Sequence, residues 1–340
     1  MAEATALAAK IQPGLHPDRL IRLMEDAVAR CELKLDGLTV LTEAATGAYV
    51  VTPILAALAG AKRVYAITGN SRYGSARDAT LLTYAVASTR KLADRIEVIQ
   101  AVGANILQEV DIITNSGHVR PIDTSKIAHL KPSAVIPLMY ESWEFRESDV
   151  DLSACRARGI RVGATNERHP AVDVFSYLGC MAMKLLLDAG IAVYQAALLL
   201  ICDNEFEPYI ERTLVAAGAR VQTYPKVPAE VGCFDAVLVA STPQEGYVLS
   251  QQEMERIERS SPGAVIAQFF GDIDRRALEC LKLAVWPEIE PPRGHMGILP
   301  SAIGPEAIVR LQTGGLKAAE DLLKGKVDRQ DGVPVFVHQI

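Results

Sequence analysis

The sequence predicts an α/β protein built as two tandem Rossmann-like domains, each a doubly wound parallel sheet, with an interdomain cleft. Apolar runs of strand length alternate with helical segments along most of the 340 residues, as in parallel sheets whose faces are covered by helices. The clearest unit is 196–221, where AALLLIC leads through a polar turn into a helix and a second strand. A long apolar helical segment at 171–189 separates two such regions.

The overall composition is that of a soluble globular protein. Hydrophobic residues make up 49% and charged residues 22%, and the net charge is −6 without a long run of one sign. Neither nucleic acid nor a membrane surface is therefore expected as a partner. Apolar runs fall far short of the roughly 20 residues that cross a bilayer, and the first residues do not form a signal peptide. We expect a cytoplasmic protein that binds a small-molecule substrate.

The six cysteines and the apolar helix add two expectations. The cysteines are scattered, without a CxxC pair or a histidine at metal-ligand spacing. They predict buried free thiols in a reducing compartment, and no metal site. The segment 171–189 carries more apolar residues than one stripe requires, so we predict at least a homodimer.

The first domain is predicted over 1–170, with a C-terminal helix at 305–325 packing back on it. An amphipathic helix at 17–33 comes first. Short apolar and β-branched runs then predict strands at 38–44, 63–68, 95–100, 111–116 and 134–139, helices at 50–59, 75–92 and 124–130, and an edge strand at 161–165.

The second domain, 171–304, repeats the alternation. Strands are expected at 198–202, 220–224, 235–241, 264–270 and 283–288, with helices at 205–217, 250–260 and 272–281. The tail helix is interrupted in pattern by Gly314-Gly315, a pair that disfavours a helix interior.

Four phrases between about Asp111 and Gly325 carry a family resemblance. They are DVDLSACRARGIRV, AVDVFSYLGCMAMKLLLDAG, DAVLVASTPQEGYVLSQQEMERIERSSPGAVIAQFFGDIDRRAL and ILPSAIGPEAIVRLQTGGLKAAEDLLKG. In this order they resemble the end of the first lobe, the interdomain helix, the region of the catalytic arginine and the closing segment of the D-2-hydroxyacid dehydrogenase group, which includes formate and glycerate dehydrogenases. The resemblance implies two Rossmann-like lobes and an oxidoreductase that uses NAD or NADP.

The signature residues of that family are replaced in this chain. At the place of its GxGxxG turn stands DNEFEP (203–208), whose exposed carboxylates repel a phosphate by about 0.3–1 kcal/mol each. Tyr224-Pro225 stand where a ribose-binding acid is expected, and Leu299-Pro300-Ser301 stand at the histidine position. We therefore do not expect the second domain to bind NAD in the family manner, and the family's catalytic residues are not carried over.

Candidate cofactor-binding residues lie mainly at strand ends of the first domain, where ligands of open α/β sheets bind. Thr46 and Gly47 begin a helix and can offer backbone N–H groups to an anion. Asn70, Ser71 and Arg72 lie where the ribose of a nucleotide would fall, and an arginine there suits a 2′-phosphate. The competing interpretation of this segment is a polar turn. Three further strand-end hydroxyl residues complete the set: Ser116, Ser241 and Thr242.

The first domain, with an ATG loop followed by RVYAITGNS and DRIEVIQ, also resembles a class I methyltransferase core. S-adenosylmethionine is therefore the alternative cofactor. That family usually has an acidic residue at the second strand end, where this chain has Asn70.

Three histidines are candidate acids or bases, because the ordinary pKa of about 6.5 suits proton transfer near neutrality. His295 lies between glycines in RGHMG, and His169 lies in NERHP with Glu167 or Asp173 able to orient it. His118 follows the strand at 111–116, with Arg120 available for a substrate carboxylate. For His169 the competing interpretation is a hinge loop whose histidine hydrogen-bonds locally.

A pair of glutamates follows the fifth predicted strand. Glu141 and Glu144 are three residues apart and share one face if the turn is helical. A solvated acidic turn is the competing interpretation.

Three functions remain open. The first is a diverged NAD(P)-dependent oxidoreductase acting on a small carboxylate-bearing metabolite. The second is a non-catalytic descendant of a dehydrogenase that binds a small molecule or serves as a partner subunit. The third is an S-adenosylmethionine-dependent transferase that uses the N-terminal domain.

Overall fold

The computed structural model describes residues 12–230, 232–326 and 334–340. The chain divides into two compact units, Met1–Val174 with Gly304–Ile340 (unit 1) and Phe175–Ile303 (unit 2). The sequence placed these boundaries at 170 and 304. Val172 and Val174 belong to unit 1 because both are buried in its core. The predicted cleft between the domains stays a prediction.

Unit 1 is built on a seven-stranded sheet in the order β12-β6-β5-β4-β1-β2-β3. Only β12 runs antiparallel to its neighbour; the other strands are parallel. Without β12, the order is the 3-2-1-4-5-6 of dinucleotide-binding Rossmann domains. The strands are β1 (Thr39–Glu43), β2 (Arg63–Ile67), β3 (Ile96–Ile99), β4 (Ile112–Ile113), β5 (Val135–Leu138), β6 (Arg161–Thr165) and β12 (Val337–Gln339).

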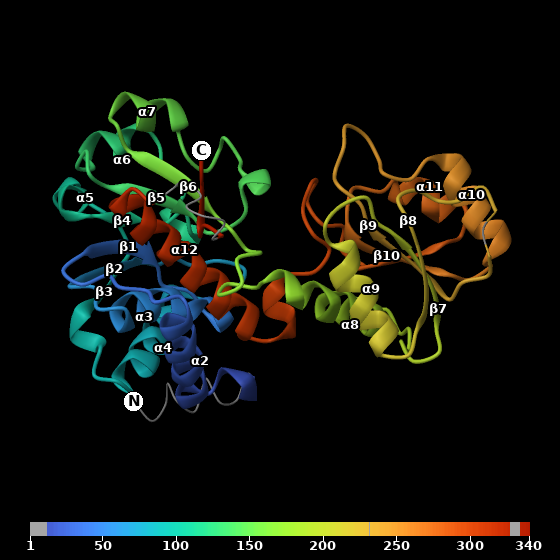
Figure 1. Cartoon of the computed structure of the whole chain (residues 1–340), viewed down its shortest axis with the longest axis horizontal. Helices are drawn as coiled ribbons and strands as arrows, with labels where there is room; N and C mark the ends of the chain where they lie inside the picture. The colour runs from blue at the N-terminus through green and yellow to red at the C-terminus, as the bar shows by residue number, and fades with distance from the viewer. Residues whose placement is uncertain (1–11, 231, 327–333) are drawn as a thin grey trace. The chain divides into compact units, whose positions relative to one another are not determined.

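Helices cover both faces of this sheet, because successive strand residues point to opposite sides. Val40 joins the core under α2, α3 and α12, whereas Leu41 joins the core under α5, α6 and α7. Figure 1 shows α5–α7 and α2–α4 on opposite sides of the strands. The helices are α2 (Pro17–Arg30), α3 (Val51–Leu58), α4 (Ala76–Ser88), α5 (Ala104–Glu109), α6 (Thr124–His129), α7 (Leu152–Ala157) and α12 (Glu306–Lys324).

Helix α12 is continuous through Gly314-Gly315, so the expected interruption is wrong. It packs on β5, β6, α2 and α3. A Cβ at Gly314 would lie 2.8 Å from Cγ1 of Val172, and one at Gly315 would overlap the side chain of Met139. The two glycines therefore let the helix lie close to the sheet without breaking it.

Unit 2 holds a five-stranded parallel sheet in the order β11-β10-β9-β7-β8. Numbered along the chain this is 2-1-3-4-5, the flavodoxin-like order. Its elements are α8 (Leu178–Asp188), β7 (Ala197–Ile201), α9 (Glu207–Ala216), β8 (Arg220–Tyr224), β9 (Ala236–Ala240), α10 (Gln251–Ser260), β10 (Val265–Phe270), α11 (Arg275–Cys280) and β11 (Ala284–Trp286).

Three other expectations need correction. The helix predicted from residue 171 begins only at Leu178, because Asp173 has a φ of 50° and cannot continue a helix. The predicted edge strand at 161–165 is covered by β12. All six cysteines are free, but Cys180, Cys233 and Cys280 are exposed.

None of the described helices is both long enough and apolar enough to cross a membrane.

Candidate functional site

The strand order of unit 1 locates a candidate site. The connections leave β1 and β4 in opposite directions, so the point between these neighbours is the topological switch point where ligands of open sheets bind. The loop after β1 leads through a 3₁₀ turn at Gly47–Val50 into α3. Gly47 has a φ of 63° and nothing within 4 Å of a Cβ placed on it. A ligand can therefore approach the backbone here.

Glu43 ends β1 and joins the two loops at the switch point. Its Oε1 accepts a hydrogen bond of 3.1 Å from the backbone N–H of His118. The same carboxylate lies against Gly117, where a Cβ would overlap it. The ring of half-buried His118 lies over Gly69, with Cε1 3.1 Å from a Cβ placed there. The structure thus brings His118 to the switch point, beside the ends of β1 and β2.

The residues predicted to bind a ribose line the loop after β2. Asn70 accepts a hydrogen bond of 3.0 Å from the N–H of Ala76, and Ser71 Oγ accepts one of 3.1 Å from the N–H of Tyr73. Both side chains therefore also shape the turn, as its competing interpretation requires. The exposed Arg72 guanidinium lies 4.7 Å from the centre of the Tyr73 ring.

Two other predicted residues connect the loops of unit 1. Thr46 Oγ1 donates to the carbonyl of Tyr73 at 3.0 Å, which joins the loops after β1 and β2. Ser116 Oγ donates to Thr114 Oγ1 at 3.0 Å, and Thr114 donates to Thr42 at 2.9 Å. Ser116 therefore belongs to a chain of hydroxyls that runs into the buried sheet.

Three glutamates converge at the ends of β5 and β6. Glu141 is 2% exposed and Glu167 is 8% exposed, and Glu144 is half-buried, so the turn that carries Glu141 and Glu144 is not the solvated acidic turn of the competing interpretation. The N–H of Glu167 donates to Glu141 Oε1 at 2.9 Å. The backbone of Glu141 in turn donates to the carboxylates of both Glu167 and Glu144. Both carboxyl groups therefore lie beside the backbone of Glu141.

The pKa values of this pair are raised. Burial, and then the charges of Glu144 and Glu141, raise the pKa of Glu167 well above its ordinary value. Burial, and then the charge of Glu141, raise the pKa of Glu144 to about 7. The pair therefore retains a proton at neutral pH and can act as an acid. Arg168 Nε lies 3.9 Å from Glu141 Oε1 and balances part of the charge.

Tyr49 links the two groups of residues. It lies in the 3₁₀ turn that follows Gly47. Burial, followed by the charges of Glu144, Glu167 and Glu43, raises the pKa of its phenol to about 12. The phenol is therefore neutral at physiological pH and can donate a hydrogen bond.

His169 is held inside unit 1. Its Nδ1 accepts a hydrogen bond of 3.1 Å from the N–H of Ala171, and its ring stacks on Phe336 with centroids 3.6 Å apart. Burial lowers the pKa of His169 below its ordinary 6.5, despite a hydrogen bond to the backbone of Pro334. These contacts agree with the alternative of a locally hydrogen-bonded histidine, and Glu167 pairs with Glu141 and Glu144 instead.

The corresponding strand ends of unit 2 bond to one another. Asp203 Oδ1 accepts a hydrogen bond of 2.8 Å from the N–H of Thr242. Asn204 Nδ2 donates to the carbonyl of Ala240 at 2.9 Å, and Ser241 Oγ lies 3.4 Å from the carbonyl of Ile201. At the switch point between β7 and β9, the Asp203 carboxylate therefore occupies the Thr242 N–H, which a bound phosphate would need as a hydrogen-bond donor.

His295 lies in the loop before Ile298 of unit 2, and its Nδ1 is 3.0 Å from the carbonyl of Arg293. That loop is fixed by Asp272, whose Oδ1 accepts from the N–H of Gly294 at 3.0 Å. His118 and Glu167 belong to unit 1, so the predicted catalytic residues are distributed over both units. No group of three or more His, Cys, Asp or Glu that could hold a metal is found in the described parts of the chain.

Sequence reasoning did not select Glu43 or Tyr49 for the site, and it paired Glu144 with Glu141 and not with Glu167. Glu43 had a detectable signal, since it is the last residue of the first strand. Glu144 is half-buried because β6 lies next to β5 and brings Glu167 to the same place. No local sequence pattern predicts this pairing.

Comparison with known proteins finds similarity in structure only. No family model matches the chain, and no curated protein matches it in sequence. A dipicolinate synthase structure from Bacillus halodurans is similar with 11% identity and a TM-score of 0.53, covering 87% of this chain and 100% of that one. A dipicolinate synthase structure from Bacillus subtilis is similar with 10% identity and a TM-score of 0.55, covering 87% and 99%.

These structures confirm the predicted fold class of two Rossmann-like domains. At 10–11% identity, these structures show a shared fold alone.

Proposed function

We propose that the chain is a diverged NAD(P)-dependent oxidoreductase whose cofactor binds at the switch point of unit 1. The observation that supports this most is the 3-2-1-4-5-6 strand order of unit 1, the order found in dinucleotide-binding domains. The sequence resemblance alone would have directed the search for the cofactor to the second domain.

The loops at this switch point fit a nucleotide in two respects. Gly47 has an open, left-handed backbone at the start of a helical segment, which suits a phosphate. Arg72 extends from the loop after β2, where a guanidinium can pair with the 2′-phosphate of NADP. We therefore propose NADP over NAD. Glu43 departs from this fit, because its carboxylate repels a phosphate nearby.

Proton transfer would come from residues of unit 1. Bound NADPH supplies a hydride. His118 at the switch point is a candidate proton donor or acceptor, and the Glu144–Glu167 pair holds a proton that can be passed on. Tyr49 can orient a substrate oxygen as a neutral donor.

The proposed substrate is a small carboxylate-bearing metabolite. This class comes from the sequence resemblance, and the solved structures with this fold are named as synthases of a carboxylate, dipicolinate. Arg120 is an unsuitable carboxylate ligand, since it pairs with Asp149 at 3.0 Å.

A second candidate is a non-catalytic small-molecule binder, and the position of Glu43 favours it. A carboxylate at the switch point suits a ligand with a cation or hydroxyl group better than a pyrophosphate. The S-adenosylmethionine alternative has no further support, but its sulfonium makes it a useful third ligand to test.

Calorimetric titration of the full chain with NADPH, NADH and S-adenosylmethionine tests the proposal. Gly47→Val should abolish binding of NADPH, and Gly159→Val is the matched control. Gly159 has a φ of 70° and nothing within 4 Å of its Cβ position, so a valine there strains the backbone as one at Gly47 does. It lies at the amino end of β6, away from the carboxyl ends of the strands where the cofactor is proposed to bind. The oxidoreductase proposal fails if neither nicotinamide cofactor binds tighter than about millimolar, roughly −4 kcal/mol.

A further inference from the structure

The end of the chain forms a strap across unit 1. We define the C-terminal strap as residues 334–340. Its strand β12 pairs antiparallel with β6, with Val337 opposite Thr165 and Gln339 opposite Gly163. Val337 is fully buried, and its Cγ2 lies 2.5 Å from a Cβ placed on Gly163. The strap is therefore part of the sheet at the strand that leads to Glu167.

The strap is joined to the loop after β6 by both backbone and ring contacts. Asn166 N–H donates to the carbonyl of Phe336 at 2.9 Å, and Asn166 Nδ2 donates to the carbonyl of Val335 at 2.8 Å. The Phe336 ring stacks on His169 at an interplanar angle of 24°. These contacts bracket Glu167, which lies between Asn166 and His169 in the sequence.

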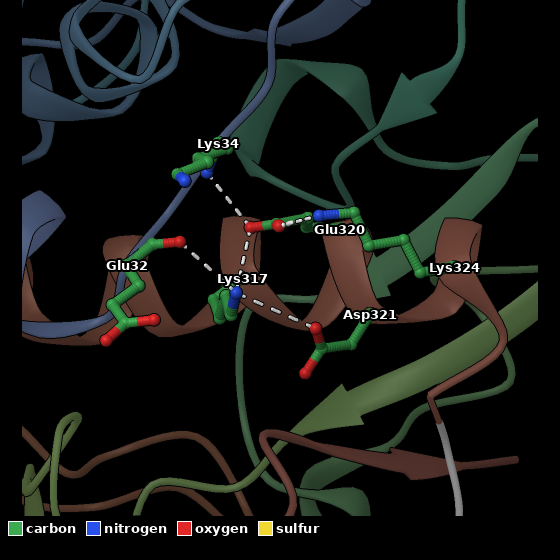
Figure 2. Close-up of polar contacts among 6 residues, drawn as sticks. All are labelled: Glu32, Lys34, Lys317, Glu320, Asp321 and Lys324. Carbon is green, nitrogen blue, oxygen red and sulfur yellow. Dashed lines mark hydrogen bonds and ion pairs between the residues drawn. The ribbon is translucent and has the colours of Figure 1, made fainter.

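Lys317 of α12 lies near the same Phe336 ring, with its Nζ 5.6 Å from the ring centroid. Figure 2 shows how this lysine is fixed, with Glu320 and Asp321 on its own helix. Lys317 Nζ is 3.0 Å from Glu320 Oε2 and 3.3 Å from the carbonyl of Glu32. An ammonium held in this network gives Phe336 a fixed cationic neighbour.

Glu320 connects the network to the segment before β1. Its Oε2 accepts a hydrogen bond of 3.0 Å from the N–H of Lys34, and its Oε1 pairs with Lys324. Figure 2 shows these contacts along α12. Lys317, which lies near the Phe336 ring, is therefore held through Glu320 by helix α12 and by the segment before β1.

The loop after β6 connects these contacts to the carboxyl groups of Glu167 and Glu144. The backbone of Glu167 is held at both of its groups: its N–H donates to Glu141 Oε1 at 2.9 Å, and its carbonyl accepts from Val174 at 2.9 Å. Displacing Asn166 or His169 would shift Glu167 relative to Glu144. The position of Glu167 depends on such support, because repulsion from the charges of Glu144 and Glu141 favours separation.

We propose that the C-terminal strap is a positioning element for the active site, and that Phe336, stacked on His169, holds Glu167 against Glu144. The proposal rests on the proposed function, since it gives the carboxyl pair a role in proton transfer. Phe336 is a positioning residue and does not itself touch the substrate.

The test is a ¹³C NMR titration of full-length protein labelled at the glutamate side-chain carboxyls, for wild type and four variants. In wild type the midpoint of Glu167 should lie well above the ordinary glutamate value of 4.5. In Phe336→Ala the Glu167 midpoint should fall toward 4.5, the ordinary glutamate value, because Glu167 leaves its buried position beside Glu144 and Glu141. Phe336→Tyr should retain the wild-type midpoint, since it keeps the ring.

Gln339→Ala is the matched control, because Gln339 is exposed in the same strap and should leave the titration unchanged. Phe336→Leu retains apolar bulk without the ring and serves if the alanine variant does not fold; it should show a smaller shift of the same sign. Hydrogen exchange over 163–174 should rise in the two variants without the ring.

An unchanged glutamate midpoint in Phe336→Ala or Phe336→Leu, with faster exchange in the loop, overturns the proposal. A wild-type protein in which the Glu167 midpoint is not raised above 4.5 overturns it as well. NADPH titration of the wild-type sample tests the proposed function separately. That measurement involves none of the strap variants, so its failure can be distinguished from failure of the positioning proposal.

Discussion

The backbone N–H of His118 donates a 3.1 Å hydrogen bond to Oε1 of Glu43, and so joins the loop after β4 to the end of β1. These strands are neighbours in the sheet although β2, β3 and helices α3 to α5 lie between them in the chain. The bond keeps the Glu43 carboxylate beside the loop that carries His118, whose ring lies over Gly69 at the end of β2.

Glu43→Gln should strengthen NADPH binding. The amide oxygen can still accept from His118, but the charge that repels phosphate is gone. An exposed charge of this kind contributes about 0.3–1 kcal/mol, so the dissociation constant should fall roughly two- to five-fold. Calorimetry measures it, and Glu97→Gln on edge strand β3 is the control. Weaker binding in Glu43→Gln would show that the carboxylate contacts the ligand favourably.

Arg72→Ala should reduce the preference for NADPH over NADH. A guanidinium–phosphate hydrogen bond contributes about 1.5–3 kcal/mol, so the NADPH dissociation constant should rise about ten-fold or more while that of NADH changes little. Arg77→Ala is the matched control, because Arg77 is exposed on neighbouring helix α4. Equal losses for the two cofactors would contradict a contact with the 2′-phosphate.

The C-terminal strap should loosen in acid. Burial lowers the pKa of His169 below 6.5, so the folded state disfavours the protonated ring. The stability that neutral His169 contributes is present above its unfolded pKa of about 6.5 and is lost as the pH falls through the lower folded value. Hydrogen exchange of 334–340, corrected for intrinsic rates, should therefore increase between pH 7.5 and pH 5.

A His169→Phe variant gives the control for this pH effect. It keeps an aromatic ring against Phe336 and removes the titrating group. Its strap should exchange at a corrected rate that does not change over the same pH range. An equal acid response in this variant would assign the effect to other groups.

Phe269→Ala should destabilise unit 2. Phe269 is fully buried and meets the ring of Phe206 edge-on at 6.3 Å. Removing such a side chain leaves a cavity and costs about 3–5 kcal/mol. Urea unfolding followed by circular dichroism measures this loss. Tyr194→Ala, at a residue 72% exposed, should change stability by less than about 0.5 kcal/mol; a similar loss in both variants would contradict the assignment of Phe269 to the core.

The regular elements could be predicted because their signals are local. Leu198 to Ile201 form a continuous apolar run, and they are indeed a buried strand between two others. The strap could not be predicted, since β12 has only three residues and pairs with β6, which lies about half the chain away in sequence. The Gly314-Gly315 pair misled for a related reason: its cost in an isolated helix is offset by close packing that only the sheet provides.

The residues of the candidate site also differ in how far the sequence could predict them. Thr46, Gly47 and His118 could be placed at strand ends from the sequence, because carboxyl ends of parallel strands lie on one edge. The meeting of Glu144 with Glu167 could not, since it depends on β6 lying next to β5 and on the turn that buries both groups.

By itself, the sequence determined that this is a two-domain α/β protein, because hydrophobic periodicity and turn residues act over a few residues at a time. Only the tertiary structure decided that unit 1 has the dinucleotide-binding strand order and that a buried carboxyl pair lies at the edge of its sheet. Strand order and burial are set by packing between distant segments, where the hydrophobic cores of the whole domain select one arrangement among the many that the same local pattern permits.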